Sequence, residues 1–142
     1  HSIRDAHTLA ARVERAANTD LSGKTALIVD DDMRNVFALS RVLRTRGLNV
    51  VMAEDGYKAI TQLEQNKLID IVLMDIMMPG MDGYATMREI RKRAEWRQLP
   101  MIAVSAKAMT GDREKCIEAG ANDYLSKPID IDKLVSMMRI YL

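Results

Sequence analysis

Residues 69–79, with the sequence IDIVLMDIMMP, decide the fold that this chain is predicted to adopt. Ile71 to Met74 are four consecutive apolar residues, too few for an ordinary helix, and Pro79 and Gly80 follow shortly after. Such a short run is typical of a buried parallel strand covered on both faces. Because a carboxylate is costly inside such a strand, we expect Asp75 to lie just past its C-terminal end, where open α/β sheets place their ligand sites.

A second apolar run ends in carboxylates in the same way. Residues 26–29, ALIV, are followed directly by Asp30, Asp31 and Asp32. A single aspartate after a strand is usually a helix cap or a solvated loop residue. The coincidence at two strand ends favours a shared acidic site instead.

Short apolar runs and amphipathic segments alternate along the rest of the chain. Further strands are predicted at 50–53, 101–104 and 124–125, and helices at 33–46, 57–65, 83–93, 112–119 and from 131 onward after Asp130. This alternation indicates an α/β fold with a doubly wound parallel sheet, right-handed crossovers and helices on both faces. Residues 1–23 are assigned as a linker with a short helix at 6–17, before one domain at 24–142.

Bulk composition argues against several classes of protein. The 142 residues are 48% hydrophobic and 29% charged, with a formal net charge of +1, which suits one globular domain without a nucleic-acid partner. The single cysteine, Cys116, excludes an intrachain disulfide and predicts a buried thiol in a reducing, cytoplasmic compartment. No stretch approaches the roughly 18 to 20 apolar residues of a membrane span, so we expect no membrane contact by this chain itself.

Parallel strands bring their C-terminal ends to one edge of the sheet. Asp30, Asp31, Asp75, Ser105 and Lys127 all follow or end predicted strands and should meet there. Crowded carboxylates repel one another unless a cation lies among them, and hard oxygen ligands with room for water suit Mg²⁺. A divalent ion beside a carboxylate, a hydroxyl and an ammonium group suits phosphoryl chemistry.

From about Lys24 to Leu142 the sequence resembles a response-regulator receiver domain. The matching motifs are LIVDD at 27–31, LMDIMMPGMDG at 73–83, SA at 105–106 and KP at 127–128. The resemblance implies the flavodoxin-like (βα)5 fold of the chemotaxis receiver, with five parallel strands in the order 2-1-3-4-5.

The resemblance also implies how the acidic edge works. Asp75 would be the phosphoacceptor, attacking a phosphohistidine in a Mg²⁺-dependent reaction and becoming an aspartyl phosphate. Asp31 would bind Mg²⁺ directly and Asp30 through water, and Asp75 with the backbone carbonyl of Met77 would complete the protein ligands. Such a domain catalyses its own phosphorylation and dephosphorylation. Because Met77 cannot hydrogen-bond an attacking water, we expect slow dephosphorylation; Lys107 is a second variable position, whose effect has no predicted direction.

Further roles follow for residues around the acceptor. Lys127 would pair with Asp75 and then with the phosphoryl group, and the bond from Lys127 to Pro128 would be cis. Ser105 would hydrogen-bond a phosphoryl oxygen and act as a switch together with Tyr124. The phosphohistidine donor would be a histidine kinase core or a histidine-phosphotransfer domain. Its predicted docking surface consists of Met33, Arg34, Phe37, Pro128 and Ile129.

Other interpretations of the sequence are weaker. Asp30 and Asp32 form the D-x-D pair of haloacid-dehalogenase-like phosphatases, but Arg34 stands where that family has Thr or Val. A flavin-binding domain would need a phosphate-binding loop rich in Ser, Thr or Gly after the first strand, and no such loop follows residues 26–29. A degenerate receiver that binds a protein or ligand without phosphorylation is the main alternative. Residues 31–39 resemble receivers at the C-terminus of hybrid sensor histidine kinases, which fits a lead-in and no output domain after Leu142; a free-standing regulator is the alternative.

Overall fold

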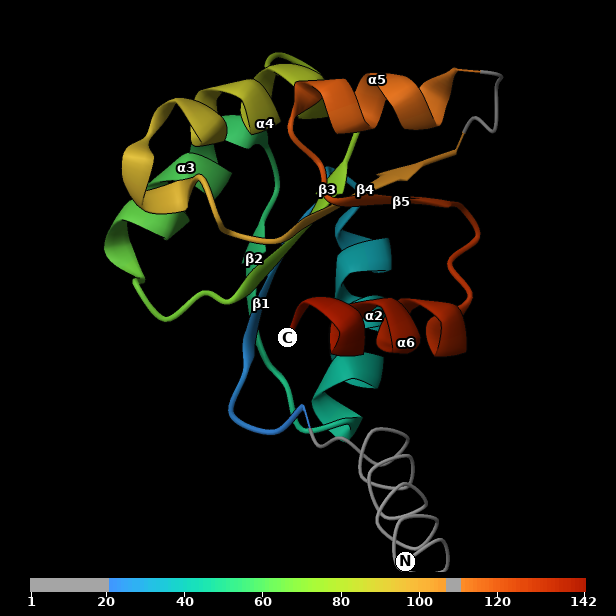
Figure 1. Ribbon diagram of the computed structural model, residues 1–142. Coiled ribbons are helices and arrows are strands. Elements are labelled where there is room, and N and C mark those ends of the chain that lie inside the picture. The colour runs from blue at the N-terminus through green and yellow to red at the C-terminus, as the bar shows by residue number, and fades with distance from the viewer. Residues whose placement is uncertain (1–20, 107–110) are drawn as a thin grey trace, which may run out of the picture.

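A computed structural model describes residues 21–106 and 111–142 of the chain (Figure 1). Its sheet contains five strands, β1 (Thr25–Val29), β2 (Asn49–Ala53), β3 (Ile71–Asp75), β4 (Met101–Ser105) and β5 (Asp123–Ser126). The helices are α2 (Met33–Thr45), α3 (Gly56–Gln65), α4 (Gly83–Lys92), α5 (Asp112–Ala119) and α6 (Ile131–Tyr141).

All neighbouring strands are parallel, and their order is β2-β1-β3-β4-β5. The predicted doubly wound sheet and its strand order are therefore confirmed. The three central strands are buried along their whole length, whereas β2 and β5 form the partly exposed edges. This burial explains the continuous apolar runs that identified β1, β3 and β4 in the sequence.

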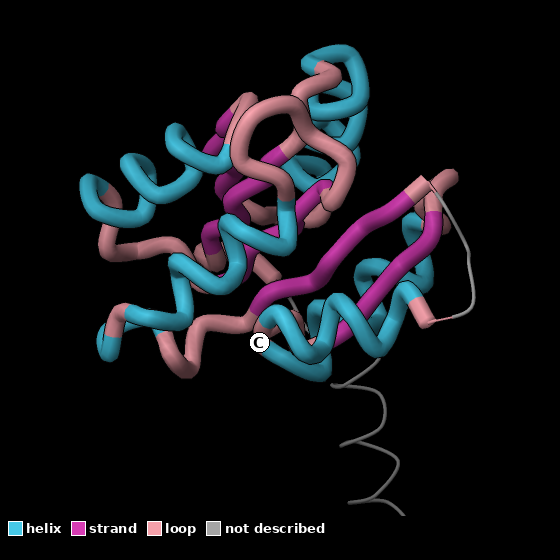
Figure 2. The backbone as a smooth tube through the Cα atoms, turned by 90° about the horizontal axis from the view of Figure 1, so that it is seen from above, coloured by secondary structure: helices cyan, strands magenta, loops and turns pink. Residues whose placement is uncertain are grey.

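The helices form two layers around the sheet, as Figures 1 and 2 show. Successive side chains of a strand point to opposite faces, so Leu27 and Val29 pack with residues of α3, α4 and α5, while Ala26 and Ile28 pack with α2 and α6. Cys116 is buried in the first of these cores, as predicted. Within the described residues, every helix is too short or too polar to cross a bilayer.

Aspartates begin four of the helices. Asp32, Asp55, Asp82 and Asp130 are the N-caps of α2, α3, α4 and α6, and each carboxylate accepts a hydrogen bond from a backbone N–H in the first turn. The cap expected at Asp130 is thus present. Because the parallel strands end at the edge where these helices begin, the capped turns frame the acidic edge of the sheet.

The predicted boundaries differ from the structure by one or two residues at several ends. Strand β5 is longer than predicted, and α4 ends at Lys92, one residue early, because a short 3₁₀ turn at Ala94–Trp96 follows. Arg91 donates to the carbonyl oxygens of Trp96 and Arg97 and stabilises this turn through contacts that no local sequence pattern reveals. Leu21 packs in the core against α2 and α6. The helix predicted at 6–17 lies outside the described residues.

Candidate functional site

Asp75 is the last residue of β3 and lies opposite Val104 of β4. The expectation that it follows the strand was wrong by one residue, because the N–H of Ile76 still donates to the carbonyl oxygen of Val104 at 3.0 Å and continues the ladder. Only 4% of Asp75 is exposed. A carboxylate is therefore held in a largely desolvated position at the end of a central strand.

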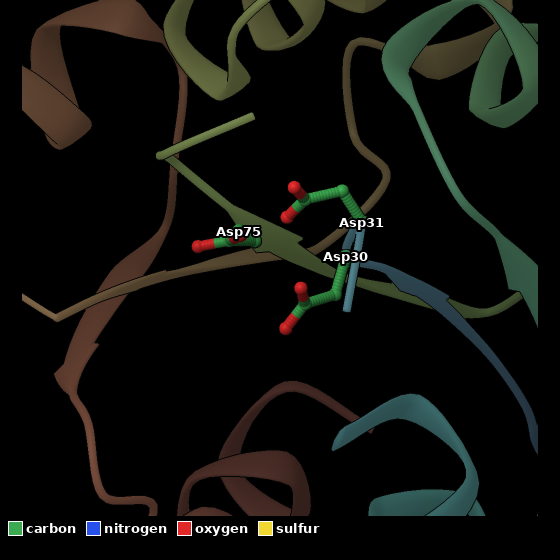
Figure 3. A group of neighbouring side chains, drawn as sticks. All are labelled: Asp30, Asp31 and Asp75. Carbon is green, nitrogen blue, oxygen red and sulfur yellow. The ribbon is translucent and has the colours of Figure 1, made fainter. Parts of the chain in front are cut away.

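Asp30 and Asp31 come to the same place from the end of β1. Ligand oxygens of Asp30, Asp31 and Asp75 all lie within 4.8 Å of one another, and Figure 3 shows the three side chains extending to one side. Asp30 is buried, its backbone N–H donates to the carbonyl oxygen of Ala53 at 3.1 Å, and its carboxylate accepts from the N–H of Asp32 at 2.9 Å. Asp31 is exposed, which leaves the cluster open to water on one side.

Lys127 brings a positive charge to this cluster. Its Nζ donates to Asp30 Oδ2 at 3.0 Å and lies 3.4 Å from Asp75 Oδ1. The expected pairing with Asp75 is therefore shared with Asp30, which is the closer partner. The backbone N–H of Lys127 donates to the carbonyl oxygen of Ser105 at 2.8 Å, and the expected cis bond to Pro128 is present.

The charges at the site shift the pKa values of two groups. Burial and the neighbouring carboxylate of Asp30 raise the pKa of Asp75 to about 6, against the opposing effects of Lys127 and the N–H of Met77. Burial of Lys127 disfavours its charge, but the hydrogen bond to Asp30 and the charge of Asp75 outweigh this and raise the pKa of Lys127. The ammonium group therefore stays charged, but its charge does not outweigh the effects of burial and of Asp30 on the carboxylate of Asp75.

Ser105 and Tyr124 lie on the far side of Asp75 from β1. Ser105 ends β4 and is buried, and Tyr124 on β5 is half-buried. Burial and the charge of Asp112 raise the pKa of the Tyr124 hydroxyl, and a hydrogen bond with Ser105 acts in the opposite direction. The two predicted switch residues are thus in contact. Asp112, the first residue of α5, is not among the predicted site residues.

The predicted docking residues do not all line one groove. Pro128 and Ile129 line a groove of about 540 Å³ between α2 and the segment before α6, which reaches Asp30 and Lys127 at one end. Met33 lines a separate hollow of about 300 Å³ beside β2. Phe37 is 54% exposed on α2, and Arg34 is exposed beside Asp32.

One further residue of the groove was missed in the sequence. Asn35 on α2 lines the groove together with Asp30 and Lys127. Its place in the first turn after the N-cap Asp32 was the available signal. Met77 is exposed, and its backbone N–H points to Asp75 Oδ1 at 3.4 Å. Lys107 lies outside the described residues.

The cluster has the chemistry of a site for a small divalent cation. Its donors are hard carboxylate oxygens, one of the three carboxylates is exposed, and the ammonium group of Lys127 is shared between the other two. Mg²⁺ prefers oxygen ligands and keeps several waters. Asp30, Asp31 and Asp75 could therefore hold Mg²⁺ with water in the open positions.

The strand order defines a flavodoxin-like α/β domain, and three carboxylates gather at the carboxyl end of its sheet. Residues 26–139 match the response regulator receiver domain, so the chain belongs to this family and is a receiver domain of two-component signalling. The signal transduction histidine-protein kinase BarA of Shigella flexneri is 37% identical over 117 residues, which cover 82% of this chain. The chain spans only 13% of the length of that kinase.

Two more relatives differ in how the receiver occurs. Protein PilH of Pseudomonas aeruginosa is 37% identical over 116 residues, which cover 82% of this chain and 95% of PilH. A solved receiver domain of a sensor histidine kinase from P. aeruginosa PAO1, with a magnesium ion coordinated in its active-site cleft, is 38% identical. It superposes with a TM-score of 0.77 over 84% of this chain and 98% of that one. Such domains thus occur both within long kinases and as nearly the whole of a short protein.

Proposed function

We propose that Asp75 accepts a phosphoryl group from a phosphohistidine, so that the chain works as an active receiver in a phosphorelay. The observation that carries this proposal is the buried Asp75 carboxylate, which shares one site with Asp30, Asp31 and the ammonium group of Lys127. A carboxylate oxygen of Asp75 forms the new P–O bond. The P–N bond breaks, and its electron pair stays on the imidazole nitrogen of the donor, so that atoms and electrons balance.

The acidic residues prepare this site for Mg²⁺. Asp31 would bind it directly and Asp30 through water, while Asp75 and the backbone carbonyl of Met77 would supply the remaining protein oxygens. When bound, Mg²⁺ supplies positive charge that offsets the repulsion between phosphoryl oxygens and carboxylates. Without the ion, the pKa of Asp75 is raised to about 6. This shift supports the proposal, because a bound cation would offset the repulsion between Asp75 and Asp30.

The residues around Asp75 would then hold the product and report it. The ammonium group of Lys127 already lies 3.4 Å from Asp75 Oδ1, so it can form an ion pair with a phosphoryl oxygen once Asp75 is phosphorylated. The hydroxyl of Ser105 would donate to another phosphoryl oxygen, and doing so would alter its hydrogen bond with Tyr124. This rearrangement is the proposed switch, because a new dianion changes which partner Ser105 prefers.

The phosphohistidine donor would approach over α2 and the segment before α6. A histidine kinase core or a histidine-phosphotransfer domain would contact Met33, Arg34, Phe37, Pro128 and Ile129. The apolar groove beside Asp30 and Lys127 offers room for side chains of such a partner. We propose a cytoplasmic reaction, either within a hybrid histidine kinase, as the similarity to BarA suggests, or in a free-standing regulator, as the similarity to PilH suggests.

Intact mass spectrometry tests the acceptor directly. The wild type and Asp75→Asn are incubated with acetyl phosphate, with Mg²⁺ or with EDTA. We expect one phosphoryl adduct on the wild type only, dependent on Mg²⁺ and removed by hydroxylamine, which cleaves acyl phosphates. If a phosphorylated histidine donor also leaves the wild type unmodified, the chain is a degenerate receiver that acts by binding alone.

A further inference from the structure

Gly56, the first residue of α3, touches the segment that follows the acceptor strand. A Cβ atom at position 56 would overlap the hydroxyl oxygen of Thr86 and would lie 3.2 Å from both the carbonyl oxygen and the Sδ of Met81. Gly56 does not adopt the left-handed backbone conformation. Glycine is therefore required at this position by space and not by backbone geometry. We call the meeting of Gly56 with Thr86 and Met81 the corner contact.

Thr86 holds the other side of the corner contact. It is completely buried, and its hydroxyl donates to the carbonyl oxygen of Asp82 at 2.7 Å. The backbone N–H of Thr86 donates to the same carbonyl oxygen at 3.0 Å. The hydroxyl is thus not needed to satisfy Asp82. It fills the space against Gly56 and fixes the end of the loop at residues 76–82.

The loop at 76–82 depends on this lateral support. Two backbone hydrogen bonds hold its ends. The N–H of Ile76 donates to the carbonyl oxygen of Val104, and the N–H of Gly83 donates to the carbonyl oxygen of Ile76 at 3.1 Å. Between them, residues 78–81 make no hydrogen bond to any part of the chain that the structure describes. Packing must therefore determine where the middle of the loop lies.

The corner contact also connects the two halves of the acidic site. The loop carries Met77, whose N–H lies 3.4 Å from Asp75 Oδ1. On the other side, the carbonyl oxygen of Ala53, three residues before Gly56, accepts the N–H of Asp30 at 3.1 Å. A displacement at Gly56 would therefore be felt at both Met77 and Asp30.

We propose that Gly56 and Thr86 are positioning residues for the phosphoacceptor site: their contact sets the position of the loop at 76–82 and so the affinity for Mg²⁺. This inference rests on the proposed function, because it assumes that Asp75 and its neighbours hold the ion. Supporting residues of this kind typically change metal affinity by about tenfold or more when they are altered.

A double-mutant cycle tests the corner contact. Gly56→Ala creates the overlap, Thr86→Ala removes the hydroxyl and leaves a gap, and in the double variant the new methyl group fills that gap. Mg²⁺ binding is measured by titration calorimetry, with amide NMR shifts of Met77 and Asp75 as a second readout. We expect affinity to fall about tenfold in Gly56→Ala, to fall less in Thr86→Ala, and to return to within about twofold of the wild type in the double variant.

Two matched controls separate positioning from loss of stability. Gly56→Ala with Thr86→Val keeps an atom where the Thr86 hydroxyl was, so it should not recover affinity. Gly120→Ala adds a Cβ 2.7 Å from Arg91 Cγ at the opposite edge of the sheet and should lower the unfolding temperature without changing Mg²⁺ affinity. Unfolding temperatures are recorded for every variant.

The outcomes distinguish this inference from the proposed function. If the wild type binds no Mg²⁺ and takes no phosphoryl group, the proposed function fails. If the wild type binds Mg²⁺ but the Gly56→Ala variant binds equally well, or if the Val variant recovers affinity as fully as the Ala variant, the corner contact does not position the site. Should Gly56→Ala not fold, the comparison of Thr86→Ala with the double variant still decides. Only a positioning role predicts that the double variant binds Mg²⁺ more tightly than Thr86→Ala does.

Discussion

Asp75 combines two properties that oppose each other in the metal-free protein. Its burial would suit the proposed role as a nucleophile, but burial and Asp30 disfavour its negative charge and raise its pKa to about 6. Lys127 reduces this conflict only in part, because it binds Asp30 more closely than Asp75. Without a bound cation, the buried carboxylate of Asp75 therefore lowers the stability of the folded protein.

We expect Asp75→Asn to stabilise the metal-free protein at pH 7.5 by on the order of 1 kcal/mol. The ordinary pKa of 3.8 applies to the unfolded chain and about 6 to the folded one, so folding binds a proton between these values. The stability of the wild type thus falls as pH rises through this window, and the advantage of the asparagine should shrink by pH 5. Urea unfolding in EDTA at both pH values measures the difference.

The exposed aspartate Asp132 provides the control. Asp132→Asn removes a charge of the same sign whose ion pair with Arg46 is solvent-exposed, so its effect should stay within about 0.5 kcal/mol. An Asp75→Asn variant that is no more stable than the wild type at pH 7.5 would contradict the account of the acidic cluster.

Met77 governs the predicted lifetime of the aspartyl phosphate. We expect Met77→Asn to accelerate loss of the phosphoryl group about fivefold, since an amide beside Asp75 can hydrogen-bond the attacking water and such a bond contributes about 1 kcal/mol. The exposed position of Met77 gives water access to its side chain. The decay of the adduct mass after removal of the phosphodonor measures the rate. Met77→Leu adds no hydrogen-bonding group, so its phosphoryl adduct should decay at the rate of the wild type. Equal decay rates in the wild type and both variants would contradict a role of position 77 in the lifetime.

Among the elements, α2 carries three of the proposed docking residues and also a polar residue on its core face. Ser40 is buried, and its hydroxyl has no hydrogen-bond partner among the described residues. Val36 and Leu43 on the same helix pack into the core beside the sheet. A buried hydroxyl without a partner lowers stability, because it loses its hydrogen bonds to water on folding.

Ser40→Ala should therefore stabilise the protein by about 1 kcal/mol. The variant no longer has to bury an unpaired hydroxyl, and alanine has the better helix propensity. Chemical unfolding measures the change. Ser136→Ala on the exposed side of α6 isolates the propensity part and should give about half of this or less. A loss of stability in Ser40→Ala would mean that the hydroxyl makes a contact in solution.

At the scale of the whole molecule, the parallel sheet places the acidic edge next to the proposed docking surface. The carboxyl ends of the strands hold the acidic residues, and α2 with the segment before α6 borders them on one face (Figure 1). Phe37 is exposed on α2 and is not needed for the core. A large exposed aromatic of this kind is a common anchor of protein interfaces.

Phe37→Ala should slow phosphoryl transfer from a phosphohistidine protein about tenfold and leave phosphorylation by acetyl phosphate within about twofold of the wild type. The reason is that only the protein donor has a surface that can contact the aromatic ring. Initial rates with the two donors measure the split. Leu68→Ala, which truncates an apolar side chain in the segment before β3 that is even more exposed than Phe37, should change neither rate. Equal slowing with both donors would place Phe37 outside the docking surface.

The order of elements and the identity of the acidic edge were determined by the sequence alone. Apolar runs such as 71–74 predict central strands because both faces of a parallel sheet are buried, and topology then brings Asp30 and Asp75 to one edge. Only the tertiary structure decided that Lys127 lies nearer Asp30, that Asn35 lines the groove, and that Gly56 is required by Thr86. These features depend on distances between segments far apart in the chain, which local propensity and hydrophobic period do not encode.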